Sequence, residues 1–345
     1  MATTYAIPDG RVAMAATLYT GNGGTQAVSN AVNGVSFQPD LVWVKARSVA
    51  YNNYLEDSVR GAGKDLSSNS TAAEATYSLL SSFNSNGFTA FTNGTYLASN
   101  ENGTTYVGWQ WKAGGTAVSN TAGSITSSVS ANTTAGFSVV TYTGTGATAT
   151  VGHGLGAAPS LIITKARNNA TPWPIYSATL GISKYLELDT TIAAGSIANY
   201  WGVSSPTSTV FGLPNANYNN NVSGNTMVAY CFAPVAGYSA FGSYTGNGSA
   251  DGPFVYTAMR PRFIMLKRTD STSDWRIYDS ARTPSNADDN VLAANTSAAE
   301  DTASGVIDVL SNGFKLRDAG ANNISGGTYI YMAFAENPFK YANAR

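Results

Sequence analysis

The stretch Tyr142-Thr143-Gly144-Thr145-Gly146 opens a cassette that occurs three times in this chain of 345 residues. Each copy begins with Tyr-Thr-Gly-x-Gly, continues to a proline, a mostly apolar run and a lysine, and later has a glycine that precedes an aromatic strand. The copies begin at Tyr19, Tyr142 and Tyr244. Because recurrence in a fixed order marks one supersecondary unit used repeatedly, we interpret the chain as three copies of one domain.

The middle of each copy predicts a short buried strand that a proline opens and a lysine closes. The two residues are six positions apart in every copy: Pro39 and Lys45, Pro159 and Lys165, Pro261 and Lys267. A lysine at the end of a buried strand is expected to extend to solvent. A ligand site built from the three lysines is the alternative interpretation.

The copies predict three domains of roughly 100 residues, each long enough to bury its own core. The predicted boundaries are repeat one with an N-terminal arm at 1–112, a Gly/Ser/Thr-rich linker at 113–135, repeat two at 136–237, and repeat three with a C-terminal tail at 238–345. Within the linker we expect one edge strand, near Ile125 and Val129. The tyrosine turns that begin each copy are expected to be hairpin turns in which glycine supplies positive φ angles.

The fold class that this pattern predicts is all-β, with three tandem antiparallel β-sandwich or jelly-roll-like domains and little helix. Each copy contains about seven short runs rich in Val, Ile, Thr, Tyr and Phe, separated by Gly, Asn and Pro. Short helices are expected only within residues 71–80 and 296–310. A helix-capping role is then the simplest interpretation of Glu74 and Glu300.

Composition excludes several classes of protein. Only 11% of the residues are charged, where about 25% is usual, and the net charge is −1, so the surface is largely neutral and polar. A chain without a basic stripe is not expected to bind nucleic acid. The longest uncharged stretch is rich in Asn, Ser, Gly and Pro, which argues against membrane insertion. We also expect no signal peptide at the N-terminus, and a core position for the single cysteine, Cys231.

Charge is distributed unequally among the copies. Residues 1–112 carry thirteen charged side chains, residues 113–238 carry five, and residues 239–345 carry twenty-one. Burial of the middle repeat in an assembly would explain this depletion, since interface cores contain few charges. A surface solvated through hydroxyl and amide groups would explain it equally well.

The sequence contains few candidate catalytic residues. The single histidine, His153, precludes a histidine-based metal cluster within the chain and is expected to be a turn residue. A glycosidase would need two carboxylates, and the candidates are Glu56-Asp57, Asp288-Asp289 and Glu300-Asp301. We therefore expect no enzymatic activity, no cofactor and no metal, with a polysaccharide-degrading enzyme as the catalytic alternative.

Positions at which the copies differ are the candidates for binding. Tyr200, Trp201 and Tyr218 have no aromatic counterparts in the third copy, and aromatic rings beside amides are typical of sugar recognition. Asp288 and Asp289 lie in an insertion of the third copy. We predict these five residues as receptor or subunit contacts, with core packing as the alternative for the aromatic ones.

Several strings resemble tailed-bacteriophage virion proteins of otherwise unknown function. They are the run 135–146 with the following 153–165, the run 241–248, and the C-terminal run 329–339. Together with the tandem copies, the resemblance extends over nearly the whole chain. It implies a component of the phage particle, since members of this group are usually described as tail-fibre or structural proteins.

The resulting hypothesis is a non-enzymatic structural component of a tailed-phage virion, namely a tail-fibre or receptor-binding subunit. Such a protein is made in the cytoplasm of the host bacterium and assembled into the particle. Its expected partners are other virion proteins, further copies of itself, with a trimer favoured, and a glycan of the host surface. A capsid decoration or head-fibre protein is the first alternative function.

Overall fold

The computed structural model describes residues 6–302 and 305–338. In these ranges the chain forms 26 β-strands and one short 3-10 helix, η1 (Gly10–Val12). Every pairing between neighbouring strands of the sheets is antiparallel, and each copy forms one large and one small sheet. The prediction of an all-β, sandwich-like fold with little helix is confirmed.

The large sheet of each copy, which we call its main sheet, has the same strand order in all three repeats. In repeat one the order is β1 (Met14–Thr20), β8 (Thr105–Trp111), β3 (Leu41–Ala46), β4 (Tyr54–Asp57) and β5 (Leu66–Ser67). In repeat two the equivalent strands are β11 (Phe137–Thr143), β18 (Thr226–Phe232), β13 (Leu161–Ala166), β14 (Pro174–Ser177) and β15 (Lys184–Glu187), followed by β16 (Gly195–Ser196). In repeat three they are β19 (Ser239–Thr245), β26 (Thr328–Pro338), β21 (Met259–Arg268), β22 (Arg276–Asp279) and β23 (Leu292–Ala293).

A small outer sheet covers one face of each main sheet. Repeat one has β2 (Thr25–Ser29), β7 (Gly87–Phe91) and β6 (Leu80–Asn84). Repeat two has only β12 (Ala149–Gly152) and β17 (Val210–Leu213). Repeat three has β20 (Phe254–Tyr256), β25 (Gly313–Leu316) and β24 (Ile307–Leu310). The two layers of each repeat enclose a separate apolar cluster, as in a β-sandwich.

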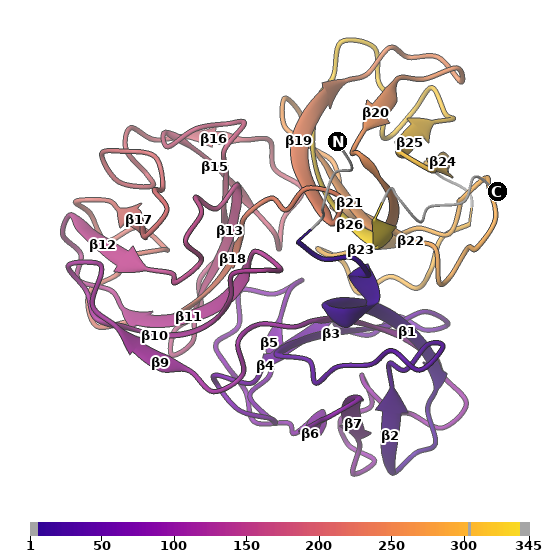
Figure 1. Cartoon of the computed structure of the whole chain (residues 1–345), viewed down its shortest axis with the longest axis horizontal. Coiled ribbons are helices and arrows are strands. Elements are labelled where there is room, and N and C mark those ends of the chain that lie inside the picture. The colour runs from indigo at the N-terminus through magenta and orange to yellow at the C-terminus, as the bar shows by residue number, and fades with distance from the viewer. Residues whose placement is uncertain (1–5, 303–304, 339–345) are drawn as a thin grey trace.

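The other faces of the three main sheets meet in one common core. Strand β3 shows why, because Leu41 and Trp43 point into the common core while Val42 and Val44 point to the outer sheet. Strands that are buried on both faces become continuously apolar. Figure 1 shows the three repeats as lobes around this centre, with repeat one below, repeat two on the left and repeat three at the upper right.

Equivalent aromatic residues of the three repeats meet at the centre. The ring centroids of Trp111 and Phe232 are 6.3 Å apart, those of Trp111 and Phe334 5.7 Å, and those of Phe232 and Phe334 5.7 Å. The repeats are therefore arranged with approximate three-fold symmetry within one chain, and they share a core in addition to their separate sandwich cores.

The predicted linker belongs to the main sheet of repeat two. Strands β9 (Val118–Asn120) and β10 (Ser127–Asn132) extend that sheet beyond β11, giving eight strands in all. Val129 is buried in the sandwich core of repeat two, and Ile125 forms an isolated bridge to Val151 of the outer sheet. The segment 113–135 is therefore part of repeat two, and it contains two strands where one was expected.

The tyrosine turn of each cassette needs its glycines for two different reasons. A Cβ on Gly21, Gly144 or Gly246 would lie 2.1–2.3 Å from a backbone carbonyl oxygen, too close for any other residue. The second glycine of the turn has a positive φ in every copy, for example 76° at Gly23. The expectation of positive φ at these turns is confirmed. The expectation of hairpin turns is wrong, because each turn connects a strand of the main sheet to a strand of the outer sheet: β1 to β2, β11 to β12 and β19 to β20.

The two expected helices do not form in the described residues. Residues 71–79 are irregular, with Ala75 bridged to Asp65, and Leu80 begins strand β6. The corresponding part of repeat three is likewise not helical, and residues 303–304 of that prediction lie outside the described residues. The backbone of these segments bonds to other repeats, since Glu74 N–H donates to the Arg167 carbonyl and Glu300 N–H to the Arg47 carbonyl. These tertiary bonds replace the intrahelical ones. Among the described residues, none belongs to a helix long and apolar enough to cross a membrane.

Candidate functional site

Two of the predicted contact residues lie in the protein interior. Tyr200 is 2% exposed and Trp201 is fully buried, and both belong to the sandwich core of repeat two. The segment before β17 forms no third strand of the outer sheet there, so the two rings cover that face of the main sheet instead. The prediction that Tyr200 and Trp201 are receptor contacts is therefore wrong, and the core-packing alternative is correct.

Tyr218 lies at the edge of the same aromatic cluster. Its half-buried ring stacks on Tyr200, with centroids 5.4 Å apart and an interplanar angle of 15°. It borders a shallow hollow together with Val203, which is 71% exposed. A contact role for Tyr218 thus remains a prediction that its position permits.

The predicted acidic pair of repeat three is divided between interior and surface. Asp288 is only 1% exposed, and its backbone N–H donates to the Ile307 carbonyl at 2.7 Å. Asp289 beside it is half-buried. Asp288 is therefore not available as a surface contact, because the insertion folds back as an irregular extension of the outer sheet. A role for Asp289 stays a prediction.

The buried carboxyl of Asp288 predicts a pH-dependent stability. Burial raises the pKa of Asp288 from 3.8 to about 7, so the folded protein keeps a proton that the unfolded chain releases near pH 4. The free energy of unfolding should fall by on the order of 3 kcal/mol as pH rises from about 4 to about 7, and this contribution should be level above pH 7. Urea denaturation of wild type and Asp288→Asn across this range tests it. The variant should lack this fall, and identical pH profiles for the two proteins would refute the assignment.

The three cassette lysines connect the repeats in a ring. Each is buried, and its Nζ donates to a backbone carbonyl of the neighbouring repeat. The bonds are Lys45 to Thr296 at 3.0 Å, Lys165 to Thr71 at 2.9 Å and Lys267 to Thr191 at 2.9 Å. Burial lowers the pKa of Lys45 to about 7 and that of Lys165 and Lys267 to about 8. The expectation that these lysines extend to solvent is wrong, because the face on which they lie is covered by another repeat.

A second set of equivalent side chains makes the same kind of contact. Trp173 Nε1 donates to the Ser67 carbonyl at 2.9 Å, and Trp275 Nε1 donates to the Glu187 carbonyl at 2.8 Å. Asn53 holds this position in repeat one, and its Nδ2 donates to carbonyls of repeat three. Each junction between repeats therefore has a polar contact that satisfies buried backbone groups.

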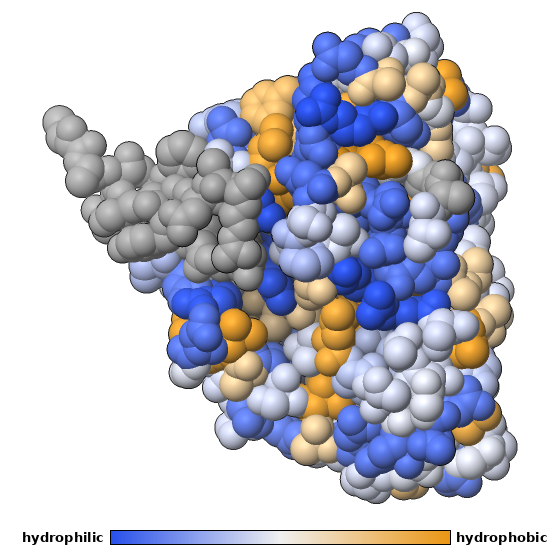
Figure 2. All heavy atoms as spheres, turned by 90° about the vertical axis from the view of Figure 1, so that its right-hand side faces the viewer, coloured by the Kyte–Doolittle hydropathy of each residue, from blue (hydrophilic) through white to orange (hydrophobic). Residues whose placement is uncertain are grey.

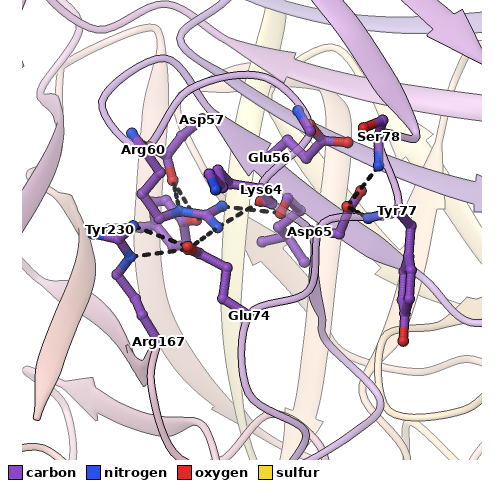
Figure 3. A network of polar contacts seen from close by, with 12 residues as sticks. Glu56, Asp57, Arg60, Lys64, Asp65, Glu74, Tyr77, Ser78, Arg167 and Tyr230 are labelled. Atoms are coloured by element: carbon purple, nitrogen blue, oxygen red, sulfur yellow. Dashed lines mark hydrogen bonds and ion pairs between the residues drawn. The ribbon is translucent and has the colours of Figure 1, made fainter.

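A buried ion network lies between repeats one and two (Figure 3). Arg60 contacts Asp57 of its own strand-end turn and donates to Glu74 Oε2 at 3.0 Å. Arg167 of repeat two donates to both oxygens of Glu74 at 2.9 Å, and Tyr230 donates to Asp57 Oδ2 at 2.9 Å. Every charge in the network has an opposite charge beside it, as burial of ions requires.

The junction of repeats three and one carries the equivalent network. Arg282 contacts Asp279 and Glu300, Arg47 of repeat one contacts Glu300, and Trp109 Nε1 donates to Asp279 Oδ2 at 2.9 Å. Glu74 and Glu300 thus bind arginines of two repeats, so the capping interpretation of these residues is wrong.

The junction of repeats two and three has no such network. All five residues that form it at the junction of repeats one and two are replaced here by uncharged ones. The equivalent residues, by their distance from the cassette, are Ser177, Leu180, Ala194, Thr269 and Met332. The backbone contact survives, since Ala194 N–H donates to the Thr269 carbonyl at 2.8 Å. Loss of the anions together with the cations leaves no buried charge uncompensated, and it accounts for part of the low charge of repeat two.

Three of the six candidate catalytic carboxylates, Glu56, Asp57 and Glu300, have structural partners. Glu56 accepts backbone N–H bonds from Gly63 and Leu80, and its pKa is raised by burial and by the adjacent Asp65. Asp57 and Glu300 belong to the ion networks. In the part of the chain that the structure describes, no three His, Cys, Asp or Glu side chains are grouped as a metal site would require.

The single histidine and the single cysteine of the sequence also lie in the interior. His153 is buried, its Nδ1 accepts the Leu155 N–H at 3.2 Å, and burial lowers its pKa. These contacts fit the expected turn role. Cys231 is a buried free thiol in the repeat-two core, as predicted.

A cluster of partly exposed aromatic residues lies on repeat one, where no site was predicted from the sequence. Tyr51, Tyr54 and Tyr96 line a surface hollow of about 210 Å³, and Tyr77 stacks on Tyr96. We call this feature the tyrosine hollow. Its lining residues come from three separate segments, at 51–54, 79 and 95–98, so no single local pattern reveals them. A signal was nevertheless present, because Tyr51 and Tyr54 correspond to Thr171 and Pro174 in repeat two.

Comparison with known proteins places the chain in one family. The model of the DUF7483 family, a domain of unknown function, matches residues 12–338. The chain therefore belongs to this family. No curated protein and no solved structure matches it significantly.

Proposed function

We propose that this member of the DUF7483 family is a non-enzymatic structural component of a tailed-phage particle, namely a tail-fibre or receptor-binding subunit that contacts the host surface. The resemblance of its repeated strings to virion proteins supports its assignment to the phage particle. The binding role rests on one observation: partly exposed aromatic side chains border a surface hollow on repeat one, and Tyr96 among them is 41% exposed.

The arrangement of the repeats suits a mechanical part of a particle. The common core, the lysine ring and two buried ion networks join three sandwiches into one block. A rigid block holds its surface in a fixed orientation, which lowers the entropic cost of each contact. Adhesion would then arise from many weak polar contacts multiplied by the number of copies in the particle.

The surface has the mixed character that such adhesion requires. On the face shown in Figure 2, hydrophobic residues occur in small groups between hydrophilic ones. Partners in our proposal are other virion proteins, a host-surface glycan and further copies of the chain, with a trimer favoured. Because one chain already fills its own central core, such a trimer would have to associate through outer surfaces.

Immuno-electron microscopy of intact particles tests the proposal. Antibodies against the purified protein should label the tail and reduce adsorption of particles to host cells. Labelling of tail-less heads would instead support a capsid decoration or head-fibre protein. Release of reducing sugars from purified host polysaccharide by the purified protein would favour the enzyme alternative and overturn the non-enzymatic assignment.

A further inference from the structure

We propose that the tyrosine hollow of repeat one binds an uncharged pyranose ring of a surface glycan. The inference rests on the proposed function, because it identifies the site and the ligand class through which host contact would occur. Tyr51, Tyr54 and Tyr77 also pack against the sandwich core of repeat one. The sheets themselves do not depend on Tyr51 and Tyr54, since repeats two and three form the same sheets with Thr171 and Ser273, or Pro174 and Arg276, at these positions.

The aromatic wall of the hollow has the geometry that sugar stacking requires. Tyr77 and Tyr96 stack with centroids 4.1 Å apart and an interplanar angle of 26°, and Tyr54 meets Tyr77 edge-on at 6.1 Å. Tyr96 remains 41% exposed although Tyr77 covers part of it. Exposed tyrosine combines an apolar ring for the C–H face of a sugar with a hydroxyl for its polar groups.

The remaining lining residues indicate an uncharged ligand of about one ring. Leu79 and Ala98 supply apolar surface, and Asn52 and Thr95 supply polar groups. None of the lining residues is an acid, a lysine or an arginine. Asn69 Nδ2 donates to Asn52 Oδ1 at 2.8 Å and so orients the Asn52 amide. The volume is below the roughly 300 Å³ at which pockets for drug-sized ligands begin, which favours a single ring.

Hydrogen bonds within the protein fix the residues that line the hollow in the absence of a ligand. Thr92 Oγ1 donates to the Tyr96 carbonyl at 2.6 Å, and the Tyr106 hydroxyl donates to the Leu97 carbonyl at 2.7 Å. On the opposite rim the Tyr51 hydroxyl donates to Glu101 Oε2 at 2.9 Å. A site fixed by such bonds loses little conformational entropy on binding.

Saturation-transfer NMR on the full chain tests the site. The probes are the methyl glycosides of glucose, galactose and N-acetylglucosamine, with glucuronate as the anionic comparison. We expect dissociation constants in the millimolar range for at least one neutral glycoside and weaker transfer to glucuronate. Tyr96→Ala should weaken binding at least ten-fold. Tyr256→Ala, which removes a 63% exposed tyrosine of β20 in repeat three, should leave it unchanged.

Each possible result bears on the proposal. Absence of binding to all three neutral glycosides would overturn it, as would equal binding by wild type and Tyr96→Ala. Preferential binding of glucuronate would overturn the uncharged class. If Tyr96-dependent sugar binding is found but antibodies do not label the tail, the site stands and the proposed function fails. If the protein mediates adsorption and Tyr96→Ala binds sugar normally, the function stands and this site fails.

Discussion

Replacing Arg60 by alanine is expected to lower the free energy of unfolding by about 3–5 kcal/mol. The side chains of Arg60 and Asp57 are both fully buried, so removal of the guanidinium leaves the Asp57 carboxylate without its cation. The Leu55 carbonyl loses a bond as well, and Glu74 keeps only Arg167. Urea denaturation at pH 7 measures the loss. A change below about 1 kcal/mol would mean that water or another cation compensates Asp57.

A partly exposed arginine of repeat three provides the matched control. Arg268 pairs with Asp270 within one turn, and both side chains are partly exposed. Because solvent screens such a pair, Arg268→Ala should cost less than about 1 kcal/mol. A similar loss in both variants would show that removing any arginine destabilises the protein, and it would remove the argument from burial.

The neutral junction of repeats two and three shows what can replace the ion network. The combined variant Asp57→Ser, Arg60→Leu, Glu74→Ala, Arg167→Thr and Tyr230→Met copies the five residues that occupy the junction of repeats two and three. Replacing a complete buried network by neutral residues is often neutral in stability, whereas removing one partner is not. We therefore expect the combined variant to be more stable than Arg60→Ala despite its five changes. The reverse order would mean that the network contributes net stability at this junction.

Much of the fold could be predicted because it depends on local sequence. The Tyr-Thr-Gly-x-Gly turn, the six-residue step from Pro39 to Lys45 and the short apolar runs are sufficient for the repeat, the strand class and the turn chemistry. The relation between repeats could not be predicted in this way. Lys45 bonds to Thr296, 251 positions away, and nothing near Lys45 indicates a carbonyl rather than solvent at the end of its side chain.

The site predictions show the limit of comparing copies. Residues found in only one copy can bind a partner, but they can also fill a space where that copy lacks an element of the others. Tyr200 and Trp201 do the latter, since they fill repeat two where its outer sheet has no third strand. Tyr96 is also private to one copy, but there the outer sheet is complete and the residue remains 41% exposed. Distinguishing the two cases requires the three-dimensional arrangement.

Removal of the central tryptophan is the strongest test of the common core. Trp111 contacts Phe232 of repeat two and Phe263 and Phe334 of repeat three, and its side chain is almost completely buried. Trp111→Ala should cost about 3–5 kcal/mol, because it removes buried surface and leaves a cavity that three sheets border. Scanning calorimetry measures the shift of the melting temperature.

The shape of that calorimetric transition decides whether the repeats are autonomous domains. Repeats with independent cores would melt in separate steps, and Trp111→Ala would then shift only the step of repeat one. A shared core couples them, because unfolding of one main sheet exposes the inner faces of the other two. We therefore expect one transition in wild type and one in Trp111→Ala, with calorimetric and van't Hoff enthalpies that agree. Three transitions, of which the variant shifts one, would show that each repeat is stable without the others and that the central aromatic contacts contribute little.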